Sequence, residues 1–448
     1  MQMPEASPTP AVDPDPQIAS RPVLRLEDLE AMALKNNPTL AQADAGIRAA
    51  EGRRIQAGLF PNPTVGYFVE EFVFRSPGES AEHGVFVEQT FPLGGKLGKS
   101  RRIFAREKEQ AELIAEAQKM RVLNSVRLLY YEALGAQRLV DLRVYLAGLT
   151  REATEITRQL HNVGQADTPD QLEIEIETQR AEIDLLRAQN DREEVWRALG
   201  AMVNNPELKP SRLEGSLEVN QTALDEDQIM SSLLRESPEI RVAQAGAERA
   251  RAVLARARAQ KIPDLSVSGG LAYNFERFEP LVPTIGNQRK GMEGRLQVGV
   301  NVPIFNRNQG GIAAAEAELG IAERELQRLQ LTLRTRVGSS LRAYRNALQM
   351  TEKYRTEVIP RARAGYEMYL SNFRQMAAAY PQVLIAQRTL FQVEVEYARA
   401  LIQLRQTGVG LRGFLLTGGL DSVGRPGEST EGIKLRSPNE ATGESDRP

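Results

Sequence analysis

The hydrophobic and polar positions of this chain change their period in a fixed order. Residues 292–302 alternate apolar and polar side chains, with Leu296 and Val298 on one face and Arg295 on the other. A period of two predicts a β-strand that has one apolar and one polar face. The following stretch, residues 312–374, places apolar residues three and four apart, which predicts a long helix. The pattern therefore predicts strands that alternate with long helical segments.

The same order of elements occurs twice, about 200 residues apart. The first copy holds NNPTL (36–40), LFPNPTV (59–65) and QTFPLGG (89–95), and the second holds ESPEI (236–240), KIPDLSV (261–267) and NVPIFNRNQGG (301–311). A unit of this size is far longer than the roughly 20 to 50 residues of solenoid or propeller repeats. We therefore expect a duplicated domain.

The domain organisation follows from this duplication. We predict two repeats between a disordered segment 1–22 and a disordered tail 421–448. The first repeat, 23–220, contains a β-hairpin 63–93 and a helical hairpin 97–200. The second repeat, 221–420, contains a β-hairpin 264–303 and a helical hairpin 311–412. Each repeat also begins with a helix. Both ends of the chain are rich in Pro, Gly and polar residues, which is typical of disorder.

The long helical segments carry heptad patterns that predict antiparallel coiled-coil hairpins. In the first hairpin the outgoing positions are Leu139, Leu142, Leu146, Leu149, Ala153, Ile156 and Leu160, and the returning positions are Leu172, Ile176, Gln179, Ile183 and Leu186. In the second they are Val337, Leu341, Tyr344, Leu348, Thr351 and Val358, followed by Leu384, Phe391, Val395, Ala398 and Ile402.

Each hairpin turns at a tip. Gly164 interrupts the first helix, and the run Thr168 to Gln171, with Pro169 at the first helical position, predicts a capping box that restarts it. The second tip, between Phe373 and Pro381, contains neither Gly nor Asp, so its shape is expected to differ.

The predicted strands have the length of membrane-spanning strands, about 10 residues each. The first copy is less regular, because Phe68 and Phe86 fall among the polar positions; an edge or interfacial position would account for this. Four strands cannot close a barrel, and an open sheet edge cannot be left in lipid. If the strands cross a membrane, the protein must oligomerise, and three copies would supply twelve strands. The alternative is an ordinary two-faced sheet in a soluble domain, but the sequence offers no globular core for such a sheet to cover.

The composition limits the possible functions. The 448 residues carry a net charge of −2, with arginines interleaved among glutamates, so we expect no nucleic-acid partner. There is no cysteine, and His83 and His161 are far apart, so we predict no metal site and no cofactor. No stretch reaches the roughly 20 apolar residues of a membrane helix. The first residues lack the regions of a signal peptide, so export would require a leader that this sequence does not show.

One motif suggests chemistry and is set aside. GGKLGKS (94–100) follows a strand and opens a helix, as a phosphate-binding loop does. It is one residue short of that pattern, and its counterpart in the second copy has no Lys-Ser pair. A glycine bend from strand to helix is the better interpretation. We find no catalytic constellation and predict that the protein is not an enzyme.

In the type and order of these elements, the chain resembles the TolC-like family of outer-membrane efflux channels. The resemblance covers nearly all of residues 24–418. Four segments resemble the CzcC-like branch, which serves heavy-metal efflux: QAGLFPNPTV (56–65), QTFPLGGK (89–96), KIPDLSVSGGL (261–271) and VPIFNRNQGGIAAAEAEL (302–319). The resemblance implies a mainly α fold with a membrane β-barrel portion, in which the four strands of each chain complete a twelve-stranded barrel in a homotrimer.

The resemblance also implies a function and partners. The protein would lie in the outer membrane of a Gram-negative bacterium, in contact with outer-membrane lipid, and extend into the periplasm. It would be the passive exit duct of a tripartite efflux pump, joined by a periplasmic adaptor protein and fed by an inner-membrane proton-driven transporter. By match to the tip motif of the family, Gly164, Asp167 and Leu172 would face the adaptor, as would Met376 and Tyr380 at the less regular second tip.

The resemblance implies heavy-metal cations as the cargo. Two alternatives stay open: the same duct serving drugs or secreted polypeptides, and, in a different class, a soluble coiled-coil scaffold protein.

Overall fold

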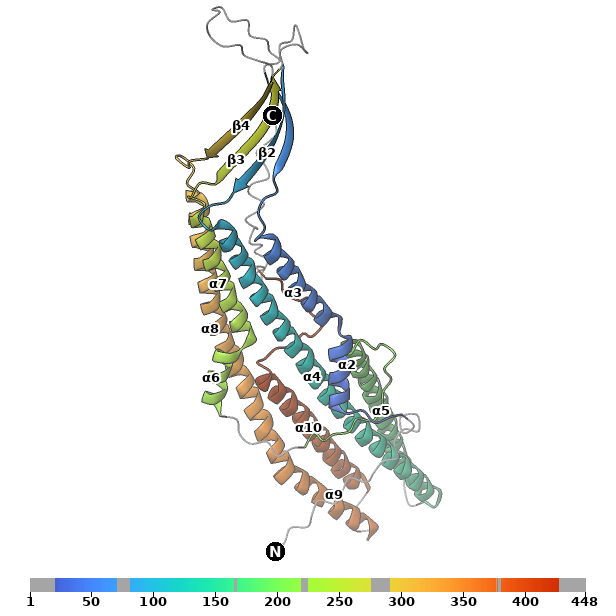
Figure 1. Ribbon diagram of the computed structural model, residues 1–448. Coiled ribbons are helices and arrows are strands. Elements are labelled where there is room, and N and C mark those ends of the chain that lie inside the picture. The colour runs from blue at the N-terminus through green and yellow to red at the C-terminus, as the bar shows by residue number, and fades with distance from the viewer. Residues whose placement is uncertain are drawn as a thin grey trace, which may run out of the picture. The chain divides into compact units, whose positions relative to one another are not determined.

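The computed structural model describes residues 21–70, 81–164, 167–218, 225–274, 291–375, 377 and 380–426 (Figure 1). The elements follow the order α2 (Leu26–Asn36), α3 (Pro38–Gln56), β1 (Thr64–Glu70), β2 (Glu82–Phe91), α4 (Lys96–Asn162), α5 (Thr168–Met202), α6 (Glu226–Glu236), α7 (Pro238–Ala259), β3 (Leu265–Asn274), β4 (Gly291–Val300), α8 (Gln309–Lys353), the π-helix η1 (Tyr354–Val358), α9 (Ile359–Arg374) and α10 (Tyr380–Arg412). Most of the two predicted terminal segments, 1–22 and 421–448, lies outside the described residues.

The chain forms two compact units, and each takes residues from both copies of the repeat. The first unit comprises Met1–Asp44, Ile114–Ile240 and Leu329–Val423, and the second comprises Ala45–Leu113, Arg241–Arg328 and Gly424–Pro448. The sheet belongs to the second unit, and the tips of both helical hairpins belong to the first. The long helices α4 and α8 begin in the second unit and continue into the first.

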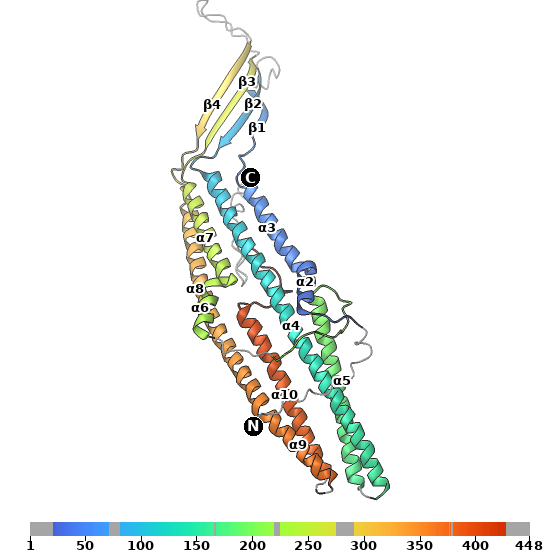
Figure 2. The same cartoon turned by 60° about the horizontal axis from the view of Figure 1, so that its bottom comes forward.

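The sheet of the second unit has four antiparallel strands in the order β1-β2-β3-β4, and Figure 2 shows them side by side in this order. The register aligns Val65 with Val87 and Gly269 with Leu296, so the apolar positions of all four strands share one face. On that face Leu296 is 76% exposed. The alternation that the sequence predicts is therefore present, and its apolar face is the one left uncovered in the single chain.

The two phenylalanines that interrupt the alternation lie over glycines on the polar face. A Cβ atom added to Gly66 would lie 2.4 Å from the ring of Phe86, and one added to Gly84 would lie 2.5 Å from the ring of Phe68. The guanidinium of Arg295 stacks on Phe68 at 5.2 Å from the ring centre. Glycine leaves room that any side chain would fill, so the rings lie against the backbone. Packing against glycine explains the irregular pattern, and Phe68 also lies on the edge strand β1, as the edge explanation requires. Phe72 and Phe74 lie outside the described residues.

The glycine bend before α4 is structural. Gly94 and Gly95 both have positive φ, 69° and 68°, a conformation that glycine adopts without strain. The ammonium group of Lys96 donates to Asp264 at 2.7 Å, and that of Lys99 donates to the backbone oxygen of Gly94 at 2.5 Å. Both lysines of the motif therefore fix the passage from strand to helix, as the sequence interpretation requires.

The core of the first unit is built from helices of both hairpins. One cluster gathers around Trp196, Leu199 and Val126, and a second gathers around Val337 and Tyr344. The side chains of Asn124 and Gln118 donate to backbone oxygens of the segment that follows α10, including Gly413 and Gly419. These buried amides fasten the segment after α10 to α4, because an unpaired backbone carbonyl would be costly there.

The predicted seam of the second hairpin is confirmed, whereas the returning half of the first is wrong. Buried seam residues of the second hairpin are Val337, Leu341, Tyr344, Thr351, Leu384, Phe391, Val395 and Ala398. In the first hairpin Leu172, Ile176, Ile183 and Leu186 are 49–59% exposed, and the buried residues along this part of α5 are instead Ile174, Thr178 and Ala181. Small and hydroxylated residues allow the helices to approach closely, so they occupy the seam although the larger residues form the more regular heptad.

Candidate adaptor-facing tip

The first tip, the turn between α4 and α5, is closed by Gly164. Its φ of 75° lies in the left-handed region, and its N–H donates to the backbone oxygen of His161 at 3.0 Å. A helix end of this kind favours glycine, because other L-residues are strained there. The first helix therefore ends where the sequence predicts, just before Gly164.

The start of α5 differs from the predicted capping box. The N-cap is Asp167, one residue before the predicted Thr168, and its side chain makes no capping hydrogen bond. Pro169 lies in the first turn, as expected of a residue without an N–H. The carboxylate of Asp167 is thus not used to satisfy the helix end, although it lies at the tip.

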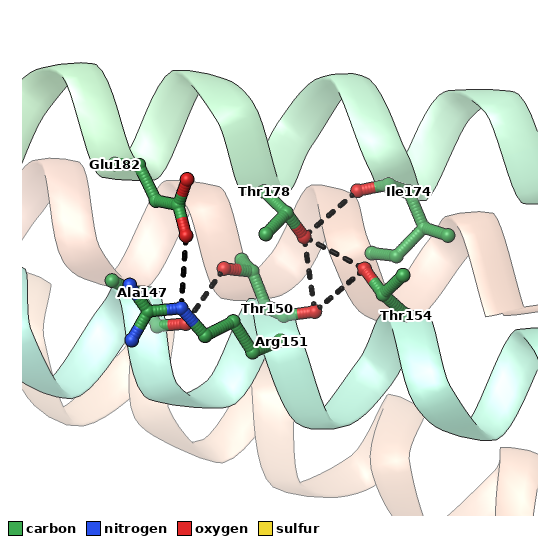
Figure 3. A network of polar contacts seen from close by, with 7 residues as sticks. All are labelled: Ala147, Thr150, Arg151, Thr154, Ile174, Thr178 and Glu182. Carbon is green, nitrogen blue, oxygen red and sulfur yellow. Dashed lines mark hydrogen bonds and ion pairs between the residues drawn. The ribbon is translucent and has the colours of Figure 1, made fainter.

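Along the hairpin from this tip, threonine side chains join α4 to α5, as Figure 3 shows. The hydroxyl of Thr178 lies 2.8 Å from that of Thr154 and 3.1 Å from the backbone oxygen of Thr150, and it lies 3.0 Å from the oxygen of Ile174 on its own helix. The guanidinium of Arg151 donates to Glu182 at 2.9 Å beside this network. The seam of this hairpin therefore depends on hydrogen bonds as well as on apolar contact.

The second tip is described only in part. Helix α9 ends at Arg374, and the backbone N–H of Gln375 donates to Ser371 at 3.1 Å. Met376 lies outside the described residues. Tyr380 is the first residue of α10, and its side chain is not among those described. Of the five predicted tip residues, the structure brings Gly164, Asp167 and Leu172 to the first tip, and Leu172 is 54% exposed there.

A groove of about 380 Å³ lies between α4, α5 and α10, and the sequence analysis did not anticipate it. Across it, Arg388 of α10 pairs with Glu177 of α5 at 2.5 Å, and Arg143 of α4 pairs with Asp184 at 2.8 Å. The ring of Tyr145 lies 5.8 Å from that of Phe391. The two hairpins are therefore joined by both charge and aromatic contact. The spacing of charges along one helix gives no sign of such pairs, because each pair joins two different helices and Glu177 and Arg388 lie some 200 residues apart.

Ionisable groups near the tip have shifted pKa values. The guanidinium of Arg158 and the amide of Gln159 donate hydrogen bonds to Glu155 and lower the pKa of its carboxyl. Burial raises the pKa of the Tyr366 hydroxyl, and the nearby Tyr145 adds to this. Neither shift brings the group to the middle of the pH range, so neither of these two groups is poised for acid–base chemistry there.

The described residues contain neither a cluster of metal ligands nor a membrane-spanning helix. Within them, no three His, Cys, Asp or Glu side chains gather in a way that could hold a metal ion. None of the described helices has the length and apolar character needed to cross a membrane.

A four-stranded sheet with an exposed apolar face, combined with long helical hairpins in duplicate, is the architecture of an outer-membrane channel. A family model described as outer membrane efflux protein matches residues 29–205 and 229–416, so the chain belongs to the outer membrane efflux protein family.

Two curated relatives match most of the chain. The cobalt-zinc-cadmium resistance protein CzcC of Cupriavidus metallidurans is 26% identical over 397 residues, which cover 87% of this chain and 89% of the relative. The pyoverdine export outer membrane protein OpmQ of Pseudomonas putida is 22% identical over 412 residues, covering 86% of this chain and 84% of the relative.

Solved structures share the fold. The outer membrane protein VceC of Vibrio cholerae has a TM-score of 0.71 at 18% identity and covers 88% of this chain and 96% of its own. CusC has a TM-score of 0.65 at 16% identity, with 88% and 92% covered. The predicted fold class is therefore confirmed: the chain is mainly helical, with four strands of the kind that complete a barrel in the trimeric TolC-like channels.

Family membership confirms four further predictions. The chain is an outer-membrane protein that extends into the periplasm, it is an efflux channel of a tripartite pump, it resembles the TolC-like family as expected, and it is a passive channel rather than an enzyme. The soluble coiled-coil scaffold is thereby excluded.

Proposed function

We propose that this protein is the exit channel for divalent heavy-metal cations in a tripartite pump. The observation that carries the cargo is the 26% identity to CzcC, which extends over nearly the whole of both chains. The relative OpmQ, at 22% identity, is named for the export of pyoverdine, so export of an organic compound is the second candidate.

The working form would be a homotrimer. Strands β1 and β4 are the edges of the sheet, and each presents unpaired backbone groups along one side. In lipid such groups must find partners, and pairing β4 of one copy with β1 of the next would satisfy them. Three copies would then close twelve strands into one barrel, with the exposed apolar face toward lipid and the polar face toward the lumen.

The channel would act without holding its cargo tightly. The chain has no cysteine, so it lacks the thiolate ligands that bind soft metals most strongly. A duct benefits from weak binding, because cargo must leave as readily as it enters. Selection of the cargo would belong to the inner-membrane proton-driven transporter and to the periplasmic adaptor that joins it to the tips.

The cargo is tested by deleting the gene in its native host. We expect the minimum inhibitory concentrations of cobalt, zinc and cadmium salts to fall several-fold and to recover on complementation. The tolerance of dyes and detergents, measured in parallel, should stay unchanged. If tolerance of the organic compounds falls and metal tolerance does not, the metal cargo is wrong and the organic alternative is favoured.

A further inference from the structure

Four short segments connect the strands to the helices, and all of them lie at one end of the sheet. They are residues 57–63, 92–95, 260–264 and 301–308, and together they are called the collar here. The register pairs Phe91 with Leu265 and Leu265 with Val300, so these strands leave the sheet at the same end. Because the helices extend into the periplasm, the collar lies at the periplasmic end of the sheet.

The collar exposes large apolar side chains. Phe305 is 91% exposed, and Phe60 is 63% exposed. The exposed apolar residues of the collar are Leu59, Phe60, Leu93, Ile262, Val302, Ile304 and Phe305. Contiguous apolar surface of this kind marks a contact with a partner or a membrane. Because Val302 ends the apolar row of β4, the collar continues the apolar face of the sheet beyond the strands.

Hydrogen bonds hold the collar in shape. The carboxylate of Asp264 accepts from the ammonium group of Lys96 at 2.7 Å and from the backbone N–H of Leu93 at 3.0 Å. The side-chain amide of Asn308 donates to the backbone oxygen of Ala257 at 3.0 Å. Three of the four segments are therefore fastened to their neighbours, and their apolar side chains stay exposed although their backbone is fixed.

The collar and the adjoining helical turns carry a strong positive excess. Residues 57–63, 92–102, 256–264 and 301–308 hold eight lysines and arginines but a single carboxylate, Asp264, whereas the whole chain has a net charge of −2. The eight are Lys96, Lys99, Arg101, Arg102, Arg256, Arg258, Lys261 and Arg307. Among the described residues, Lys96 pairs with Asp264 and Arg258 with Glu316, while Lys261 and Arg307 are exposed and have no carboxylate partner.

We propose that the collar binds anionic phospholipids of the inner leaflet of the outer membrane. The apolar side chains would enter the boundary between acyl chains and headgroups, and Lys261 and Arg307 would reach the lipid phosphates. Long cationic side chains bury their apolar stems while keeping the charge at the headgroups. Basic residues next to a membrane-embedded segment attract anionic lipids. The inference rests on the membrane orientation of the sheet in the proposed channel, and it adds a specific lipid partner at the periplasmic end.

The lipid is tested by native mass spectrometry of the full chain, expressed with a leader and delipidated in detergent. Phosphatidylglycerol should bind several-fold more tightly than phosphatidylcholine, and the double variant Lys261→Gln/Arg307→Gln should lose most of this preference. The matched control Lys35→Gln/Arg334→Gln removes the same charge from exposed positions on α2 and α8 and should keep the preference. Equal binding of the two lipids, equal loss in both double variants, or displacement of phosphatidylglycerol by equimolar inorganic phosphate would overturn the proposal.

A second measurement tests the depth of the collar and uses the absence of native cysteine. Phe305→Cys is labelled with a fluorophore, and the protein is reconstituted into phosphatidylglycerol–phosphatidylcholine vesicles that contain nitroxide-labelled lipid. We expect strong quenching at position 305 and little at the control Gln327→Cys, an exposed site roughly 27 Å along α8 from its start. A trimer without quenching at position 305 would overturn the collar contact and leave the proposed channel intact. Absence of a trimer from the unmodified chain would count against the proposed channel itself.

Discussion

At the scale of single residues, hydroxyl groups decide how the first hairpin is joined. Thr150 and Thr178 are buried, with 5% and 7% of their surface exposed. A buried hydroxyl must find a partner, and the backbone oxygens of the two helices supply it. The closest approach of α4 and α5 is therefore set by hydrogen-bond length rather than by the size of leucine or isoleucine side chains.

The residue-scale prediction concerns Thr178. Replacing it with valine keeps the shape of the side chain but removes hydrogen bonds to Thr150 and Thr154 across the seam. We expect the variant to lose about 1 to 2 kcal/mol of stability, measured as a lower midpoint of thermal unfolding by circular dichroism in detergent. Thr389→Val is the control, because Thr389 is exposed and bonds only to its own helix. Equal shifts for both variants would show that the buried network contributes nothing.

At the scale of elements, the tip of the first hairpin combines a left-handed glycine turn with an unused carboxylate. Gly164 supplies the left-handed conformation that ends the turn, and Asp167 opens α5 without a side-chain cap. A carboxylate at an N-cap usually stabilises its helix by about 1 kcal/mol. Here the side chain makes no such bond, so we expect its replacement to affect binding more than folding.

The element-scale prediction is the variant Asp167→Lys in the presence of the adaptor. If the tip meets the adaptor as proposed, we expect the amount of adaptor co-purified with the channel to fall several-fold. The level of trimer in the outer membrane should stay unchanged, because no capping bond is lost. The exposed site Arg158→Glu, about one turn before the end of α4, serves as a charge-reversal control on the other helix of the same tip. Unaltered recovery of the adaptor with Asp167→Lys would remove Asp167 from the proposed contact.

At the scale of the whole molecule, the exposed apolar face of the sheet is suited to lipid rather than to water. Leu296 and Met292 are more than 70% exposed on the apolar face, a degree of exposure that water would disfavour. Neighbouring positions on the other face are polar, and Arg295 there pairs with Glu70. The sheet therefore has one face suited to lipid and one suited to an aqueous lumen.

The whole-molecule prediction compares two adjacent residues of β4. Leu296→Arg would place a charge on the lipid face, at a cost of about 2 to 4 kcal/mol if it lies near the middle of the bilayer. We expect the yield of trimer from outer membranes to fall sharply. Gln297→Arg points to the polar face and should assemble normally. Equal yields from the two variants would contradict the membrane orientation of the sheet.

Much of the fold could be predicted from the sequence, because its causes are local. Period-two alternation gave the strands of the second copy, and heptad spacing gave the buried seam of the second hairpin around Tyr344 and Phe391. Gly164 marked the first tip because the left-handed conformation at this helix end favours glycine. Each of these features depends on residues that are close together in the chain, so a reader of the sequence has all the information needed.

The tertiary structure decided the rest, because it depends on which distant residues meet. The heptad of α5 reads as an internal seam, yet its residues are exposed, since the threonines of α4 contact the other face of the helix. Phe68 and Phe86 read as misplaced until the register brings each of them over a glycine of the neighbouring strand. The sequence by itself determined the elements and their order. Only the folded chain determined which face of each element is covered, because that depends on which distant segment packs against the face and not on the hydrophobic period of the element.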